Sequence, residues 1–310
     1  MTRRLVAILG AVVVGVGVLV GGASVGASSS TGQLPVPYNF LPSAITGGLN
    51  LADSAPGTND WNCHPSTAHP YPVILTHGIL GNANTNWQTY GPLLHNNGYC
   101  VYALTYGRLP GAGLPLSLFG GIIKIEDSAT EIAAFVDKVL AATGAHKVDF
   151  VGHSEGTVVP DYYAKYLGGG PKIDKYISLA PLWHGSDPTG LTALAKLGLP
   201  VPDLSFIGAA GEITPGSPFI TKLRAGGTPA VPGITYTNIV TKYDELVVPY
   251  TSGIQAGMTN IVVQDQCPLD LTEHFEIAAD PVASVDVLNA LDPAHPRAVP
   301  CRLVLPFIGG

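Results

Sequence analysis

The sequence predicts an α/β protein with a mostly parallel central sheet covered by helices on both faces. The first observation behind this prediction is that short apolar runs, rich in β-branched and aromatic residues, alternate with a helical pattern. The second is a length of 310 residues, which suits one large domain. The third is composition, because 46% hydrophobic against 12% charged residues is typical of a globular chain. Strands that alternate with helices pair in parallel and are buried on both faces.

The strands are expected where a short apolar run is bounded by glycine, proline or asparagine. Six runs meet this description, at residues 73–76, 101–106, 148–151, 176–180, 234–241 and 260–263.

The clearest helix lies between the second and third of these strands. Its apolar residues recur at the spacing of one helical face, at Ile132, Phe135, Val136, Val139 and Leu140. Ser128 and Glu131 have the spacing of a capping box and predict the start of the helix. Gly144 follows the last apolar residue and predicts the end.

The N-terminal residues have the layout of a secretory signal peptide. Arg3 and Arg4 precede an uncharged apolar run, and small residues at 25–27 form a cleavage pattern. We therefore expect a signal peptide at 1–27, an extended arm at 28–58 and a catalytic domain at 59–310, in a secreted protein. The alternative is an uncleaved membrane anchor, since the apolar run approaches the length of a span.

Four cysteines follow the predicted cleavage site, and an even count in an exported chain favours two disulfides. Of the three possible connectivities we prefer the local one, which joins Cys63 to Cys100 and Cys267 to Cys301 because it closes two loops of moderate length. Metal binding is the competing interpretation, but no two cysteines have the close spacing of a zinc site. We expect no metal.

The net charge of −7 argues against binding of nucleic acid, which requires a basic surface. A neutral or apolar substrate fits this composition better than a polyanion. Two stretches interrupt the alternation of strands and helices, at 107–124 and 183–232. They are candidate lid or cap segments that would line an acyl pocket, and their alternative role is surface packing.

The strand at 148–151 leads directly into Gly152-His153-Ser154-Glu155-Gly156. Gly-x-Ser-x-Gly between a strand and a helix is the nucleophile turn of the α/β-hydrolase fold, in which a strained backbone presents the serine hydroxyl. Ser154 is therefore the predicted nucleophile; the alternative is a glycine-rich turn with an idle serine. Pro160 falls early in the following helix and is expected to loosen its first turn.

A serine nucleophile needs a base and an acid, and on this fold they follow in the order Ser, Asp or Glu, His. Asp244 comes first off the fifth strand and is the preferred acid, with Glu245 as its rival. His274 follows the sixth strand and is the preferred base. His295 is the other histidine beyond Asp244 and lies between prolines near the end of the chain.

The tetrahedral oxyanion needs two donors. The backbone amides of Ile79, in the loop after the first strand, and of Glu155, which follows the nucleophile, are the candidates. An anionic Glu155 side chain would oppose charge at this place. We therefore expect that side chain to point into solvent or to be hydrogen-bonded elsewhere.

With these motifs in their observed order, residues 59–301 resemble secreted bacterial lipases of the class 2 family. The resemblance is carried by residues 59–63, 77–79, 86–87, 98–101, 106–107, 152–156, 243–245 and 273–274. It implies an α/β-hydrolase fold, hydrolysis of carboxylic esters such as acylglycerols, and the roles of nucleophile, acid and base for Ser154, Asp244 and His274. It also supports the two disulfides. The departure is at 155–157, where many relatives carry Gln or Met followed by Gly-Gly.

The expected function is that of a secreted lipase acting on acylglycerol-like esters through an acyl-enzyme on Ser154, with no cofactor. The expected partners are the ester substrate and, transiently, a lipid interface; the sequence sets no oligomeric state. Alternatives with the same residues are a short-chain esterase and an extracellular acyltransferase. An alternative from another class is a non-catalytic binding protein that retains the fold.

Overall fold

The computed structural model describes residues 32–50, 52–186 and 207–310. The predicted signal peptide at 1–27, and residues 187–206 of the second predicted cap segment, lie outside these ranges. Within the described ranges no helix is long and apolar enough to cross a membrane.

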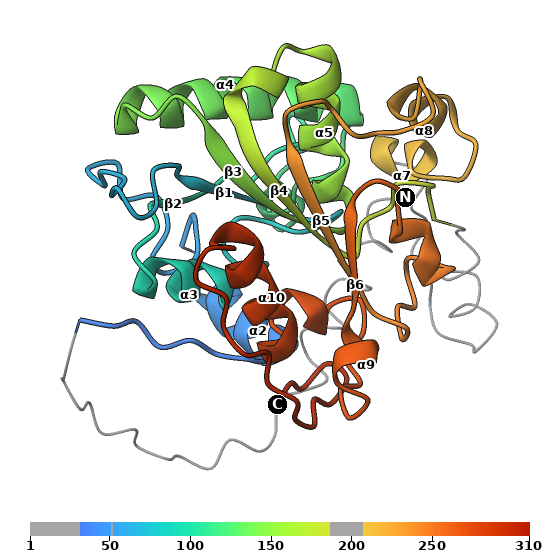
Figure 1. Cartoon of the computed structure of the whole chain (residues 1–310). Helices are drawn as coiled ribbons and strands as arrows, with labels where there is room; N and C mark the ends of the chain where they lie inside the picture. Colours follow the sequence, from blue (N-terminus) through green and yellow to red (C-terminus); the bar gives the residue numbers. More distant parts are fainter. Residues whose placement is uncertain (1–31, 51, 187–206) are drawn as a thin grey trace.

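The centre of the molecule is a six-stranded sheet in the order β2-β1-β3-β4-β5-β6, in which every neighbouring pair is parallel (Figure 1). Each strand corresponds to one of the six predicted apolar runs. The strands are β1 (Val73–Thr76), β2 (Val101–Ala103), β3 (Val148–His153), β4 (Ile173–Leu179), β5 (Thr235–Val240) and β6 (Thr259–Val262).

Helices cover both faces of the sheet because side chains alternate across each strand. On β1, Ile74 packs into one buried cluster, whereas Val73 and Leu75 pack into the other. The helices of the first face are α4 (Ile125–Thr143), α5 (Val159–Tyr166) and α8 (Pro218–Leu223). Those of the second face are α3 (Tyr90–Asn96) and α10 (Pro281–Leu291), with α2 (Phe40–Leu49) beside them (Figure 1). Two further short helices in the described ranges are α7 (Gly208–Glu212) and α9 (Val263–Gln266).

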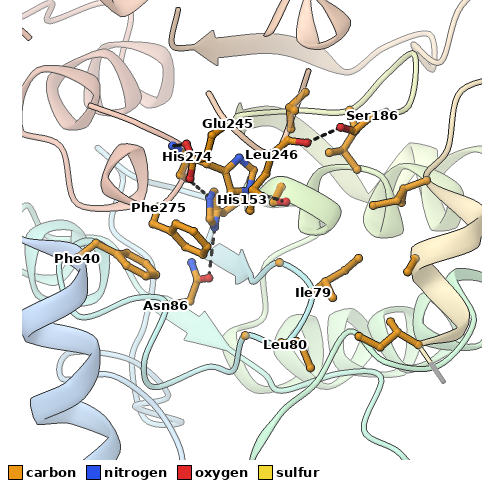
Figure 2. A pocket seen from close by; sticks show the side chains of 18 of the residues that line it. Phe40, Ile79, Leu80, Asn86, His153, Ser186, Glu245, Leu246, His274 and Phe275 are labelled. Atoms are coloured by element: carbon orange, nitrogen blue, oxygen red, sulfur yellow. Dashed lines mark hydrogen bonds between the residues drawn. The ribbon is translucent and has the colours of Figure 1, made fainter. Parts of the chain in front are cut away.

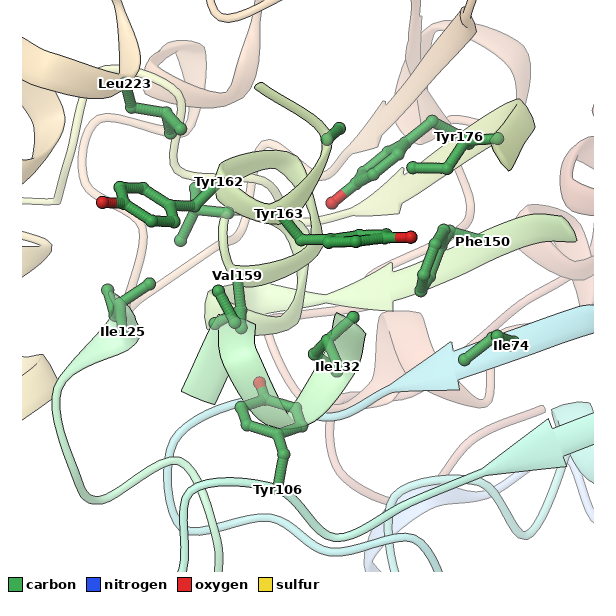
Figure 3. Packing of buried hydrophobic residues seen from close by; sticks show 14 of the residues in the cluster. Ile74, Tyr106, Ile125, Ile132, Phe150, Val159, Tyr162, Tyr163, Tyr176 and Leu223 are labelled. Atoms are coloured by element: carbon green, nitrogen blue, oxygen red, sulfur yellow. The ribbon is translucent and has the colours of Figure 1, made fainter. Parts of the chain in front are cut away.

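The first buried cluster is rich in aromatic residues. Phe150 and Tyr176 project from the sheet toward Tyr162 and Tyr163 of α5 (Figure 3). The rings of Phe150 and Tyr176 lie 5.7 Å apart. This packing fixes α5, and with it the turn that joins β3 to α5, against the sheet.

Helix α4 differs from its predicted start. It begins at Ile125, so Ser128 lies inside the helix, where its hydroxyl has no partner in the described part of the chain, and the expected capping box does not form. A carboxylate that is distant in the sequence caps the helix instead: the Ile125 amide in the first turn donates to Glu212 Oε2 of α7 at 2.7 Å. The predicted end is correct, since Gly144 closes the helix in the left-handed conformation at φ 71°.

The expected extended arm contains a helix. Residues 40–49 form α2, although glycine, serine and proline make up four of the ten residues of that segment. The Phe40 amide at its first turn donates to the buried Glu276 carboxylate at 2.9 Å. A contact across 236 residues therefore supplies the cap that local sequence lacks.

Candidate active site

Ser154 sits in a strained turn at the carboxyl end of β3. Its φ is +56°, a conformation unfavourable for a residue with a side chain. The flanking glycines permit the turn, because a Cβ on Gly152 would lie 2.3 Å from the Gly156 carbonyl oxygen. A Cβ on Gly156 would lie 2.1 Å from that of Thr76. The predicted strand-turn-helix context of Ser154 is therefore present.

The first turn after Ser154 is loosened, as Pro160 led us to expect. A 3₁₀ turn covers Ser154–Thr157, and α5 begins only at Val159. Pro160 then occupies the first turn of α5. Backbone N–H groups in a first turn have no acceptor within the helix, so the N–H that proline lacks costs no helical hydrogen bond.

Ser154, His274 and Asp244 form one hydrogen-bonded chain. The Ser154 hydroxyl lies 3.0 Å from His274 Nε2. On the other side of the ring, His274 Nδ1 lies 2.9 and 3.1 Å from the two carboxylate oxygens of Asp244. Asp244 is itself oriented by the amides of Leu246 and Val247, at 3.0 and 2.6 Å. The side chains of His274 and Asp244 are 3% and 2% exposed, so water does not compete for these bonds.

The rival acid and the rival base take other places. Glu245 accepts a hydrogen bond from the backbone amide of His274 at 3.2 Å, so it holds the main chain of this loop rather than the ring. The imidazole of His295 is 82% exposed and pairs with Asp292.

The surroundings of His274 set its proton affinity. Burial alone lowers the pKa of the imidazole, but the charge and hydrogen bond of Asp244, followed by the charges of Glu245 and Glu273, raise the pKa above its ordinary value. A ring in this environment readily accepts the proton of an attacking hydroxyl.

The loop that carries Ile79 lies directly over Ser154. A Cβ on Gly78 would be 3.0 Å from Ser154 Cβ and 3.4 Å from the Ser154 hydroxyl oxygen, so glycine at that position lets the loop approach Ser154 without crowding it. The Leu80 amide bonds to the Gly120 carbonyl at 2.9 Å, and the Gly120 amide returns a bond to Gly81 at 2.8 Å. Within the described residues, the Ile79 amide takes part in none of the bonds that hold this loop.

The expectation for the Glu155 side chain is wrong. Glu155 is fully buried, and neither carboxylate oxygen has a hydrogen-bond partner in the described part of the molecule. A Cβ on Gly121 would lie 2.3 Å from Glu155 Oε2, so the 107–124 segment encloses this side chain. Burial raises the pKa of Glu155 well above its ordinary value, with a smaller contribution from the charge of Glu212. This environment favours the neutral carboxylic acid, which lessens the predicted conflict with an oxyanion.

His153 and Asn86 have a role in the site that was not predicted from the sequence. The His153 ring lies 2.8 Å through Nε2 from the His274 carbonyl and 3.3 Å through Nδ1 from the Asn86 amide. Burial, then the charge of His274, lowers the pKa of His153 to about 3, so the ring is neutral. The available signal was the position of His153 beside Ser154, inside the motif.

A cavity of about 990 Å³ opens over Ser154 and His274. Its lining is largely apolar and comes from α2, the Gly78–Gly81 loop, α7, the residues after Asp244 and the C-terminal segment (Figure 2). The predicted 183–232 segment contributes Ser186 and residues of α7. The 107–124 segment lines no part of this cavity, contrary to expectation; it packs beneath the Gly78–Gly81 loop and supports it.

The four cysteines form the local pairing. Cys63 is bonded to Cys100, and Cys267 is bonded to Cys301. The described residues contain no group of three or more His, Cys, Asp or Glu side chains arranged to hold a metal ion.

Residues 70–285 match the model of the family described as Lipase (class 2). A triacylglycerol lipase of Burkholderia plantarii is 33% identical over 129 residues, which cover 40% of this chain and 32% of that protein. A triacylglycerol lipase of Pseudarthrobacter phenanthrenivorans is 34% identical over 99 residues, or 30% of this chain and 28% of that protein. The chain thus spans about a third of the length of these relatives.

Solved structures show the same fold. Aspergillus fumigatus lipase B superposes with a TM-score of 0.59 at 21% identity, covering 88% of this chain and 64% of that one. The mature form of Bacillus licheniformis lipase BlEst2 superposes with a TM-score of 0.55 at 17% identity, covering 74% and 94%. Together with the parallel sheet, these similarities confirm the predicted α/β-hydrolase fold.

Proposed function

Because the chain belongs to the class 2 lipase family, we propose that it is a serine carboxylic-ester hydrolase that acts on acylglycerol-like lipid esters. One observation carries the proposal. The hydrogen-bonded chain of Ser154, His274 and Asp244 ends with the Ser154 hydroxyl at the surface of a large apolar cavity. An activated hydroxyl and a binding space for hydrocarbon meet at one point, as ester hydrolysis of a lipid requires.

The first half of the reaction forms an acyl-enzyme. Ser154 Oγ attacks the ester carbonyl carbon as His274 Nε2 takes its proton, and Asp244 stabilises the imidazolium. The amides of Ile79 and Glu155 donate to the oxyanion. The bond from the carbonyl carbon to the alcohol oxygen then breaks, and His274 returns the proton to that oxygen.

The second half releases the acid. Water donates a proton to His274 and attacks the acyl carbon, and the Ser154 oxygen leaves with the returned proton. These steps use side chains and backbone amides of this chain.

Covalent labelling tests the nucleophile. A fluorophosphonate probe should label the wild-type protein and fail to label Ser154→Ala. Ser66→Ala, a control at an exposed serine, should label as the wild type does. Absence of labelling in the wild type, or equal labelling of Ser154→Ala, contradicts the proposal.

A series of p-nitrophenyl esters from acetate to palmitate tests the substrate class. The size and apolar lining of the cavity support activity on medium and long acyl chains. Activity confined to acetate would leave a short-chain esterase and overturn the lipid substrate.

We further propose that the protein is exported. Disulfides persist in oxidising compartments, which agrees with the signal peptide expected at 1–27. Mass analysis of the protein recovered from culture medium should give an N-terminus after residue 27; retention of the full chain inside the cell contradicts export.

A further inference from the structure

Three phenylalanines from distant parts of the chain line one end of the cavity. Phe40 comes from α2, Phe275 follows His274, and Phe307 comes from the C-terminal segment. The rings of Phe40 and Phe275 lie 5.8 Å apart, and those of Phe275 and Phe307 lie 6.4 Å apart. We call these three residues the aromatic wall. Phe275 and Phe307 keep 37% and 43% of their surface exposed, so a molecule in the cavity can cover them.

The aromatic wall and α7 stand over opposite faces of the sheet. Phe40 is tied to Glu276 of the turn Glu276–Ala278, whose Ile277 packs into the buried cluster of the α10 face. Ile207 and Ala209, at the start of α7, pack into the cluster of the α4 face. The cavity therefore runs across the carboxyl edge of the sheet, with Ser154 between its two ends. In Figure 2, Phe40 and Phe275 lie on one side of His274, whereas Ile79 and Leu80 lie on the other.

The chemistry of the site gives these two ends different occupants. His274 Nε2, which takes the Ser154 proton, must also protonate the departing alcohol oxygen, so that oxygen lies next to His274. Phe275 is on this side, with its ring perpendicular to the imidazole and 5.6 Å from it. The acyl chain, attached to the other side of the carbonyl carbon, then runs toward α7, where Ile207 and Ile213 line the cavity.

On the basis of the proposed ester hydrolysis, we propose that the aromatic wall is the alcohol subsite and makes the enzyme selective for esters of bulky, uncharged, apolar alcohols. Aromatic rings and alkyl chains gain contact with three phenylalanine faces, whereas an ethyl group reaches too little of them. Glu245 also lines the cavity, and its carboxylate accepts a hydrogen bond from the His274 backbone amide nearby. An acidic residue at this place disfavours an alcohol group that carries a negative charge.

The N-terminal arm thereby becomes part of the specificity site. Its position depends on the bond from the Phe40 amide to Glu276, and on paired bonds between Leu34 and Asn96 at 2.8 Å each. Phe40 also packs on the His153 ring with centroids 6.3 Å apart, so α2 contacts the group that holds His274.

Esters that share one acid and differ in the alcohol test the proposal. Ethyl, hexyl and benzyl esters have alkoxide leaving groups of similar basicity, and a pH-stat records their hydrolysis directly. The wild type should hydrolyse the hexyl and benzyl esters with kcat/KM roughly tenfold or more above that of the ethyl ester. Phe40→Ala and Phe307→Ala should each lower the benzyl-to-ethyl ratio by roughly tenfold.

The matched control is Ile213→Ala, at the α7 end of the cavity. It should change the dependence on acyl chain length and leave the benzyl-to-ethyl ratio within about twofold of the wild type. Phe40→Leu, a milder variant with an apolar side chain, covers the case in which Phe40→Ala does not fold; it should lower the ratio by a smaller factor.

An unchanged benzyl-to-ethyl ratio in Phe40→Leu and Phe307→Ala, or no preference for hexyl and benzyl esters in the wild type, overturns the alcohol subsite. A shift in acyl-chain preference in the Phe40 variants, with the alcohol ratio unchanged, reverses the assignment of the two ends and also overturns it. Failure of the underlying ester hydrolysis is seen separately, as absence of fluorophosphonate labelling at Ser154 and of turnover of every ester.

Discussion

His153 Nε2 donates a hydrogen bond to the backbone carbonyl of His274 over 2.8 Å. His153 precedes Ser154 in the chain and holds the main chain of His274, whose ring bonds to the Ser154 hydroxyl. The end of β3 and the loop of His274 are therefore joined by two hydrogen bonds. Because a carbonyl only accepts, Nε2 carries the hydrogen and Nδ1 of the neutral ring is an acceptor. The structure places the side-chain oxygen of Asn86 3.3 Å from Nδ1; rotating that amide group by 180° would turn its NH₂, which has no partner among the described residues, toward the acceptor Nδ1.

Replacing His153 should impair turnover more than binding. His153→Phe keeps a ring of similar shape but removes the bond to the His274 carbonyl, so His274 is held less firmly over Ser154. We expect kcat to fall roughly tenfold, about 1.4 kcal/mol in the barrier, with KM within about twofold. Steady-state kinetics on one p-nitrophenyl ester measure this. His295→Phe, the same change at an exposed position, should match the wild type; equal losses in both variants would contradict a positioning role for His153.

Asp244→Asn should abolish most of the turnover and shift its pH dependence. The active form has a neutral His274, whose pKa is raised above its ordinary value, so wild-type activity should fall as pH drops through a point above about 6.5. Removing the Asp244 charge lowers this pKa and moves the acid limb of kcat/KM to lower pH. We expect a loss in kcat on the order of 10⁴-fold, because the Asn side chain favours the wrong tautomer.

Glu245→Gln is the matched comparison for Asp244→Asn. Glu245 bonds to the main chain of His274 and makes a smaller contribution to its pKa. Its loss should lower kcat by about tenfold or less and move the acid limb slightly. A larger loss in Glu245→Gln than in Asp244→Asn would exchange the proposed roles of the two carboxylates.

Glu155→Gln should extend activity to alkaline pH. Burial favours the neutral form of this carboxyl, and its ionisation at higher pH would place a negative charge near the loop of Ile79, whose amide is a proposed oxyanion donor. The charge of Glu212 raises the pKa of this carboxyl further, and Glu155 in turn helps burial to raise the pKa of the nearby Tyr106 phenol. The ratio of kcat/KM at pH 9.5 to that at pH 7.5 should be higher in Glu155→Gln than in the wild type. Superimposable alkaline profiles would refute a role for this ionisation.

Asp161 should make the protein less stable as pH rises. Asp161 is fully buried on α5, where its Oδ1 accepts from the Tyr236 hydroxyl at 2.7 Å and its Oδ2 has no partner among the described residues. Burial raises the pKa of Asp161 to about 7, so the folded protein holds a proton that the unfolded chain releases near pH 4. The stabilisation from the neutral acid is full below about pH 4 and is lost as pH rises to about 7.

Asp161→Asn keeps the acceptor for Tyr236 and removes the titration. Its melting temperature should exceed that of the wild type slightly at pH 5, where part of the stabilisation is already lost, and by several degrees more at pH 8. Asp137→Asn, at an exposed position paired with Lys172, should cause a small change that is the same at both pH values. Calorimetry at pH 5 and pH 8 measures these melting temperatures. If the difference between Asp161→Asn and the wild type were the same at both pH values, it would contradict the assignment of the pH dependence to Asp161.

Local patterns in the sequence determined the strands and the turn at Ser154. Short continuous apolar runs predicted all six strands, because a strand buried on both faces needs apolar side chains along its length. Gly152 and Gly156 predicted the strained turn, since the steric demand on them comes from backbone only a few residues away or on the adjacent strand. The order of Ser154, Asp244 and His274 limited the candidates for acid and base to two each.

Tertiary structure alone decided what depends on contacts between distant residues. Asp244 and Glu245 are adjacent and equally acidic, and the position of the His274 ring determines that Asp244 bonds to it while Glu245 bonds to the main chain. Glu155 is polar and was expected near water, but the 107–124 segment folds over it and makes the neutral acid the favoured form. Helix α2 lacks local helix signals and is held by Glu276, which brings Phe40 into the cavity. In each case the deciding energy comes from burial or a hydrogen bond to a residue more than 20 positions away, which local periodicity does not encode.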